Sequence, residues 1–207
     1  MHRLRKVPLV LVVLFTLILW TGLFPPVTLP QENPTTWEVC FSPRGQCTDA
    51  IIKELNKAKN SVLVQAYSFT SFRIAEALVN AHKRGVKVEV ILDKSRKNEK
   101  KSSAPFLSAG GIPVKIDTTR GIAHNKIMII DDEIVITGSF NFTKRAEKEN
   151  AENLLIIRDK KLAEKYVENW HEHAQHLKLY VGSGVTKGGP VLQEVVQEKD
   201  KVSDHER

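Results

Sequence analysis

The sequence has 207 residues, of which 42% are hydrophobic and 27% are charged, and its formal net charge is +7. This balance is typical of a folded globular protein and excludes an intrinsically disordered chain, which would be poorer in apolar residues. The length suits one domain of ordinary size with short extensions. Three of the positive charges, Arg3, Arg5 and Lys6, lie at the extreme N-terminus, so the rest of the chain favours anionic partners only weakly.

The first 24 residues have the pattern of an export signal or a membrane anchor. The basic residues precede an uncharged apolar run of 18 residues, from 7 to 24, which just reaches the length that crosses a bilayer. Because no Ala-x-Ala-like site follows, we favour an uncleaved anchor over a cleaved signal. Basic residues stay on the cytoplasmic side, so the rest of the chain is expected outside the cytoplasm, in the periplasm or the extracellular space. A mitochondrial-type anchor would instead leave it in the cytosol.

Composition divides the rest of the chain into three parts. Residues 25–36 are rich in Pro, Thr, Gln and Asn and are predicted to be a linker. Residues 37–180 carry the apolar patterns of one domain, without an internal repeat. Residues 181–207 are dominated by Gly, Ser and charged residues, and we expect a disordered tail.

The domain alternates predicted strands with predicted helices. Strands are expected at 37–41, 61–67, 86–92, 114–116, 127–130, 134–137 and 153–157. Helices are expected at 48–59, 72–84, 104–109 and from 159 onward, with Thr48, Ser71 and Asp159 as N-caps. The last helix has an apolar stripe that places Trp170 in the core. This order predicts an α/β fold, a single domain with a mixed central sheet flanked by helices on both faces.

Cys40 and Cys47 are the chain's two cysteines. In an exported protein so close a pair favours a disulfide around residues 43–45, while two separate thiols, one of them buried in a strand, are the alternative. Two cysteines do not make a zinc site, and no histidine lies at a supporting spacing. His173 and His176 share a helix face, but a pair alone is a weak signal, so no metal and no cofactor are predicted.

Two polar pairs flank the predicted hairpin of strands 127–130 and 134–137. His124 and Lys126 precede the first strand, and Ser139 and Asn141 follow the second. Because alternate residues of a strand face the same way, we expect all four side chains to converge at one end of the sheet. A neutral imidazole is a nucleophile, an ammonium neutralises phosphate oxygens, and a hydroxyl with an amide completes a metal-free oxygen cradle. Phe140 and Phe142 occupy the alternate positions, so their side chains should point into the core.

Each pair alone is common, but the joint pattern is far more specific. With Asp131 and Gly138 it is H-x-K-x4-D-x6-G-S-x-N, which resembles the HKD motif of the phospholipase D superfamily. Segments 66–71, 83–88 and 150–153 are also similar to bacterial Nuc-type endonucleases and, more distantly, to the mitochondrial cardiolipin hydrolase/Zucchini group. The resemblance implies metal-independent phosphodiester hydrolysis, in which one histidine forms a phosphohistidine and a second protonates the leaving oxygen.

The resemblance also implies a homodimer, because the reaction needs two facing histidines and the chain has one motif. His124 of each subunit would then face a shared site. Lys126 and Asn141, assisted by Ser139, would hold the phosphate, and Glu152 would orient the histidine through its other ring nitrogen. From its place in the hairpin Asp131 is expected to support the site structurally rather than to react, and Gly138 to permit a close backbone approach.

Two substrate classes remain open. A nuclease that cuts DNA or RNA with little sequence preference is favoured by the similarity to Nuc-type sequences and by a basic run that includes Lys94, Arg96 and Lys97. That run is a substrate-binding candidate only if it flanks the site, and is otherwise a solvated loop. A phospholipase D acting on phosphatidylcholine or cardiolipin at the membrane is the alternative. An inactive binding module is disfavoured because no motif residue is missing.

Overall fold

The computed structural model describes residues 34–96, 98–118, 121–175 and 177–180. Within them one mixed sheet has the strand order β1-β7-β6-β5-β2-β3-β4-β8. The strands are β1 (Thr36–Ser42), β2 (Ser61–Ala66), β3 (Lys87–Asp93), β4 (Val114–Asp117), β5 (Lys126–Ile130), β6 (Ile134–Gly138), β7 (Glu152–Arg158) and β8 (Lys178–Leu179). The helices are α2 (Cys47–Lys57), α3 (Phe72–Lys83), α4 (Ala104–Ala109), α5 (Lys144–Lys148) and α6 (Lys160–Ala174).

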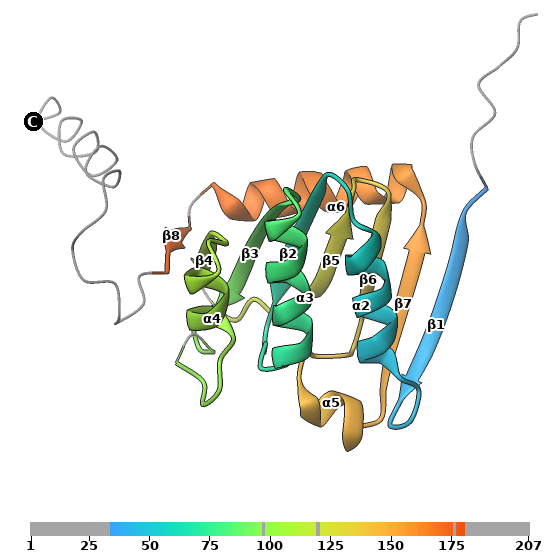
Figure 1. The fold of residues 1–207 in the computed structure, drawn as a ribbon, viewed down its shortest axis with the longest axis horizontal. Coiled ribbons are helices and arrows are strands. Elements are labelled where there is room, and N and C mark those ends of the chain that lie inside the picture. Colours follow the sequence, from blue (N-terminus) through green and yellow to red (C-terminus); the bar gives the residue numbers. More distant parts are fainter. Residues whose placement is uncertain (1–33, 97, 119–120, 176, 181–207) are drawn as a thin grey trace, which may run out of the picture. The chain divides into compact units, whose positions relative to one another are not determined.

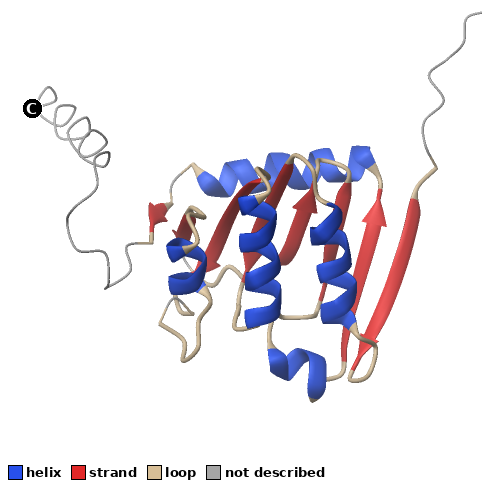
Figure 2. Ribbon diagram, viewed as in Figure 1, coloured by secondary structure: helices blue, strands red, loops and turns tan. Residues whose placement is uncertain are grey.

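Helices cover both faces of the sheet, as predicted (Figures 1 and 2). α2, α3 and α4 pack on one face and α6 crosses the other. Alternation along β2 divides the core accordingly, because Val62 and Val64 join the larger apolar cluster while Leu63 joins the cluster under α6. In that second cluster the indole N–H of Trp170 donates to the carbonyl of Val64 at 3.1 Å. Trp170 is therefore a core residue, as its helix stripe predicted.

The topology brings several strand ends together at one edge of the sheet, where edge means the side formed by the ends of strands and not an outer strand. β2, β3 and β4 are parallel, so their C-terminal ends lie together. β5 is antiparallel to β2, with Lys126 opposite Ala66, and β7 is antiparallel to β6, with Leu154 opposite Gly138. The starts of β5 and β7 and the end of β6 therefore share this edge, which is the lower one in Figure 1, beside α5.

The start of α2 differs from the prediction. The helix begins at Cys47, after Gln46 in a left-handed conformation with φ 57°, and the side chain of Thr48 does not cap it. The backbone N–H of Thr48 instead donates to the carboxylate of Glu147 at 2.7 Å. Cys47 forms a disulfide with Cys40, across a Cα–Cα distance of 5.7 Å, which ties the end of β1 to the first helical residue.

The starts of α6 and α3 were predicted from their N-cap residues, whereas two short elements were not predicted. Asp159 caps α6, because its carboxylate accepts the N–H of Leu162 at 3.0 Å. Ser71 precedes α3 as predicted, but its side chain makes no capping hydrogen bond. Helix α5 and strand β8 were not predicted, since five and two residues are too few to show a period.

The predicted anchor (1–24), most of the predicted linker and the predicted tail (181–207) lie outside the described residues. In the part of the chain that the structure does describe, no helix has both the length and the apolar character needed to cross a membrane.

Asp131 joins the hairpin to the start of β2. Its carboxylate accepts the backbone N–H groups of Lys59, Asn60 and Ser61, at 2.9, 2.7 and 3.0 Å. It follows the last residue of β5, at the opposite edge of the sheet from Lys126. Asp131 therefore has a structural role, but the expectation that it supports the catalytic residues is wrong, because the whole length of β5 separates it from them.

Replacing Asp131 by alanine should destabilise the fold. The change leaves three backbone donors without their acceptor and places alanine at φ 55°, so we expect the free energy of unfolding to fall by about 2 kcal/mol. Asp131→Asn keeps an amide oxygen and tolerates the left-handed backbone, so it should lose less. Urea unfolding measures both, with Asp132→Asn, also at positive φ, as the control. An Asp131→Ala protein with the wild-type midpoint would contradict this role.

Candidate active site

His124 lies in the loop that leads into β5 rather than on the strand itself. The pairing of β5 with β2 extends one residue beyond Lys126, because the N–H of Tyr67 donates to the carbonyl of Asn125 at 2.9 Å. His124 is exposed, whereas Lys126 is only 6% exposed. Strand alternation therefore does not set the direction of the imidazole. Instead, Nζ of Lys126 donates to the carbonyl of His124 at 2.7 Å, which fixes the backbone of the histidine beside the ammonium.

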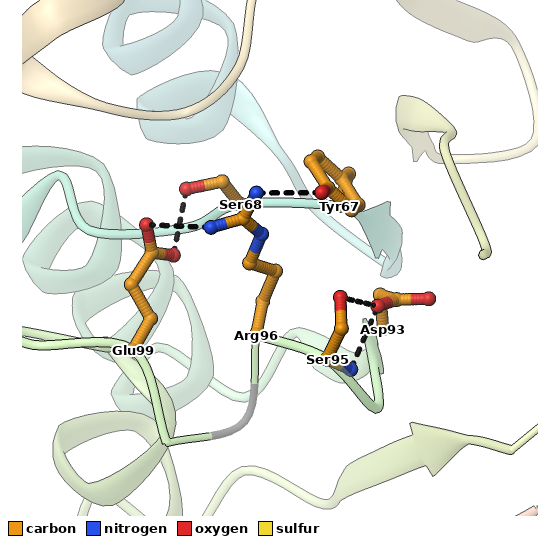
Figure 3. Close-up of polar contacts among 6 residues, drawn as sticks. All are labelled: Tyr67, Ser68, Asp93, Ser95, Arg96 and Glu99. Atoms are coloured by element: carbon orange, nitrogen blue, oxygen red, sulfur yellow. Dashed lines mark hydrogen bonds and ion pairs between the residues drawn. The ribbon is translucent and has the colours of Figure 1, made fainter.

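The ring of Tyr67 lies against the imidazole. The centroids of Tyr67 and His124 are 4.6 Å apart in an edge-to-face arrangement. Nζ of Lys126 is 5.3 Å from the same tyrosine centroid, and Cζ of Arg96 is 4.6 Å from it. A guanidinium N–H of Arg96 also donates to the Tyr67 hydroxyl at 2.6 Å (Figure 3). That hydrogen bond is the main reason why the pKa of Arg96 is raised.

A buried carboxylate positions the backbone just before His124. Asp93, the last residue of β3, is 1% exposed, and one of its oxygens accepts the N–H of Ala123 at 2.6 Å. Its other oxygen accepts the N–H of Ser95 at 2.8 Å and the hydroxyl of the same residue (Figure 3). Asp93 thus ties the end of β3 to the histidine loop. Neither Tyr67 nor Asp93 was predicted as a site residue, and the available signal was that each stands at the end of an apolar strand.

Ser139 and Glu152 form a second part of the site, where β6 ends and β7 begins. The Ser139 hydroxyl donates to one oxygen of Glu152 at 2.6 Å, and the side-chain amide of Asn150 donates to the other at 2.9 Å. Ser139 Oγ in turn accepts the N–H of Asn153 at 3.0 Å. Glu152 was expected to orient His124, but in the single chain its hydrogen bonds go to Ser139 and Asn150.

The backbone at Gly138 comes very close to β7. Its φ is 144°, and a Cβ atom there would lie 2.4 Å from the carbonyl oxygen of Asn153. That carbonyl accepts the N–H groups of Ser139 and Phe140 at 3.1 and 3.2 Å. A residue with a side chain would push the two segments apart, so glycine permits the turn that presents Ser139.

The residues after β6 alternate as the sequence predicted. Phe140 and Phe142 are fully buried, while Ser139 is exposed and Asn141 is partly buried. Oδ1 of Asn141 is buried and has no hydrogen-bond partner among the described residues. An unpartnered buried acceptor is costly, so Oδ1 is suited to a ligand or water that brings a donor. The side-chain NH₂ of the same amide is the group that can donate to a phosphate oxygen.

Burial lowers the pKa of Lys126 from its ordinary value, and the negative charge of Glu152 opposes this shift. A lowered lysine pKa means that the native state disfavours the charged form, which costs stability at neutral pH. The cost disappears as the pH rises from the lowered native pKa to the unfolded value near 10.4, where both states become neutral. The buried ammonium of Lys126 therefore lowers the stability of the folded protein at neutral pH.

Lys126→Met should consequently gain stability while losing activity. The gain over the wild type should be present at pH 7 and should shrink by pH 10, because methionine removes the buried charge at similar volume. Urea unfolding at the two pH values measures the difference. A stability difference that is independent of pH would mean that burial of the charge is not its cause.

Arg96 connects the predicted basic run to the site. Arg96 contacts Tyr67, as described above, whereas the backbone N–H of Lys94 continues the pairing of β3 with β4 by donating to the carbonyl of Asp117. Lys97 lies outside the described residues. Across the described ranges, no three His, Cys, Asp or Glu side chains converge as metal ligands, and His173 instead contacts Asp117 at 3.3 Å.

A family model described as "Cardiolipin synthase, PLD-like domain" matches residues 51–174. The chain belongs to the phospholipase D superfamily. It is 50% identical over 142 residues to "Phospholipase D" of Rickettsia prowazekii, covering 69% of this chain and 68% of that protein. It is 32% identical over 153 residues to "Mitochondrial cardiolipin hydrolase" of Xenopus laevis, covering 67% of this chain and 73% of that protein.

Solved structures agree with this membership. The crystal structure of Nuc, a phospholipase D family member from Salmonella typhimurium, matches 72% of this chain and 100% of its own length, with 37% identity and a TM-score of 0.68. The resemblance inferred from the sequence motifs is therefore confirmed, and the protein is a phosphodiesterase of this superfamily.

Proposed function

We propose that this protein is a metal-independent nuclease that cuts DNA or RNA with little sequence preference through a phosphohistidine at His124. The observation that carries the proposal is the arrangement at one sheet edge. There an exposed imidazole stands beside a buried ammonium, and both the Lys126 ammonium and the Arg96 guanidinium lie near the ring of Tyr67. Two cations close to a nucleophile suit a polyanion, and every reacting group is supplied by a side chain.

The proposed reaction has two steps. A ring nitrogen of His124 bonds to phosphorus as the bond to the leaving oxygen breaks, and a second histidine gives that oxygen its proton. The second histidine then takes a proton from water, whose oxygen bonds to phosphorus as the phosphorus–nitrogen bond breaks. Attack and departure occur on opposite faces of phosphorus, so the second histidine must face the first. In this scheme Lys126, Ser139 and Asn141 bind the phosphate oxygens.

The second histidine is proposed to be His124 of another copy of the chain. Among the described residues, the other histidines are on helices that cover the sheet faces: His82 on α3, and His171 and His173 on α6. A homodimer with a shared site supplies the missing group by symmetry. In that dimer Glu152, which already holds Ser139, is proposed to orient an imidazole as well.

Phospholipid hydrolysis to phosphatidic acid is the second candidate. Relatives named phospholipase D and mitochondrial cardiolipin hydrolase support it. So do the exposed rings of Phe72 and Phe106, 4.8 Å apart in the first turns of α3 and α4, which offer an apolar surface for acyl chains. The predicted N-terminal anchor would hold the domain at a membrane, on its outer side, with either substrate.

A single panel of substrates tests the choice. Full-length protein in detergent micelles is offered single-stranded DNA, duplex DNA, RNA, and vesicles of phosphatidylcholine or cardiolipin, with and without excess EDTA. We expect the nucleic acids to be cleaved, with undiminished rates in EDTA. Cleavage of lipid but of no nucleic acid would make phospholipid hydrolysis the favoured function. Loss of activity in EDTA would show that a metal takes part.

A further inference from the structure

The backbone around His124 is fixed by hydrogen bonds, but these bonds do not fix its ring. The carboxylate of Asp93 accepts the N–H of Ala123 at 2.6 Å, and Nζ of Lys126 donates to the carbonyl of His124 at 2.7 Å. Both contacts set where the histidine stands and leave rotation about its side-chain bonds open. Within the described ranges, the aromatic contact to the exposed imidazole comes from Tyr67, at a centroid distance of 4.6 Å.

Tyr67 is itself held at both ends. Its backbone N–H donates to the carbonyl of Asn125 at 2.9 Å, which ties it to the segment that carries His124. At the other end its hydroxyl accepts a guanidinium N–H of Arg96 at 2.6 Å, and the guanidinium carbon lies 4.6 Å from the ring centroid (Figure 3). The ring is therefore a fixed wall on one side of the imidazole.

The contacts of Arg96 are directed at this tyrosine. Besides the ring and the hydroxyl of Tyr67, the guanidinium approaches the carboxylate of Glu99 at 3.8 Å. Glu99 accepts the hydroxyl of Ser68 at 2.8 Å, next to Tyr67 in the chain (Figure 3). Nε of Arg96 is buried, away from solvent. A rigid, planar guanidinium in these surroundings is suited to bracing an aromatic ring.

We propose that Tyr67 is a positioning residue that keeps the imidazole of His124 aimed at phosphorus, and that Arg96 acts through Tyr67. This role rests on the proposed nucleophile at His124 and adds the residues that orient it. The tyrosine ring occupies the space into which the imidazole would otherwise turn, so fewer orientations compete with the reactive one. Arg96 is thereby assigned to the support of the nucleophile, whereas the sequence suggested a substrate contact.

Hydrolysis of bis(p-nitrophenyl) phosphate by the full-length protein tests the role of the ring. In Tyr67→Leu, kcat should fall by about tenfold to a hundredfold while KM stays within about twofold, because the diester is still bound but the nucleophile is poorly aimed. Tyr67→Phe keeps the ring, so its kcat should stay within about threefold of the wild type. Tyr166→Leu is the matched control, since Tyr166 is a partly buried tyrosine of α6, and it should keep the wild-type values.

A double-mutant cycle tests the role of Arg96. Arg96→Met removes the donors at similar length, and it should lower kcat by about threefold or more at an unchanged KM. In the Tyr67→Leu background the same change should have no further effect, because the ring that Arg96 braces is gone. Losses that multiply in the double variant would show that Arg96 acts independently of Tyr67 and would overturn its assignment.

Two results would overturn the role of Tyr67: wild-type kcat in Tyr67→Leu, or a rise in KM at unchanged kcat, which would make Tyr67 a substrate contact. Urea unfolding checks that each variant is folded. If Tyr67→Leu is not, Arg96→Met still tests the arrangement, because a wild-type kcat there would contradict it. Failure of the proposed nucleophile is distinguishable, since His124→Ala would then remain active.

Discussion

Replacement of His124 by alanine should abolish phosphodiesterase activity, with kcat at least about a thousandfold below the wild type. No phosphohistidine can form at this position without the imidazole, and the pattern H-x-K occurs at His124. The side chain is exposed, so its loss should leave the fold intact. Hydrolysis of bis(p-nitrophenyl) phosphate measures the effect without any assumption about the natural substrate.

The control is another exposed histidine. His171 on α6 contacts the ring of Trp170 at a centroid distance of 5.3 Å, on the other face of the sheet, and His171→Ala should keep the wild-type kcat. Rapid acid quenching of a reaction with a labelled diester should give a phosphoprotein with the wild type and none with His124→Ala. Appreciable turnover by His124→Ala would mean that His124 is not the nucleophile.

The sheet and the position of the site were predicted from the spacing of apolar residues along the chain. Apolar runs of three to seven residues between turn signals predicted the strands, and the short hairpin between 127–130 and 134–137 required the start of the first strand and the end of the second to meet. Alternation also sent Phe140 and Phe142 to the core, where they are fully buried. These features depend on residues that are close in sequence, so a single chain was sufficient to find them.

The contacts that hold His124 could not be found in this way. Tyr67 and Arg96 are 29 residues apart, and Asp93 and Ala123 are 30 apart. They meet because parallel β2 and β3 end side by side and β5 begins next to β2, which no local pattern specifies. A tyrosine or an aspartate after an apolar strand is common, so its role depends on the tertiary neighbour.

The local partners of Glu152 were missed for a different reason. The resemblance to the family directed attention to a histidine partner for this carboxylate. In the single chain its oxygens meet the donors that lie nearest, Ser139 and Asn150, because β6 and β7 are adjacent. In the proposed homodimer, a role for Glu152 toward an imidazole would depend on how the second subunit approaches, and the sequence pattern within one chain carries no signal for that approach.

Mixed dimers make this dependence measurable. If each site needs His124 from both subunits, a heterodimer of wild type and His124→Ala should be as inactive as the His124→Ala homodimer, because one subunit lacks the nucleophile or the acid at every site. Co-expression of two differently tagged chains and tandem purification isolates the heterodimer. Its kcat on bis(p-nitrophenyl) phosphate is compared with that of a doubly tagged wild type prepared in the same way.

Independent sites would give a different result, since the heterodimer would then keep about half of the wild-type activity per dimer. Pairing the wild type with Arg84→Gln controls for tagging and exchange, because that arginine is away from the site, and it should retain full activity. A half-active His124→Ala heterodimer would require the acid to come from within one chain. Loss of activity in the heterodimer, together with full activity in the control, would place one histidine of each shared site on each subunit.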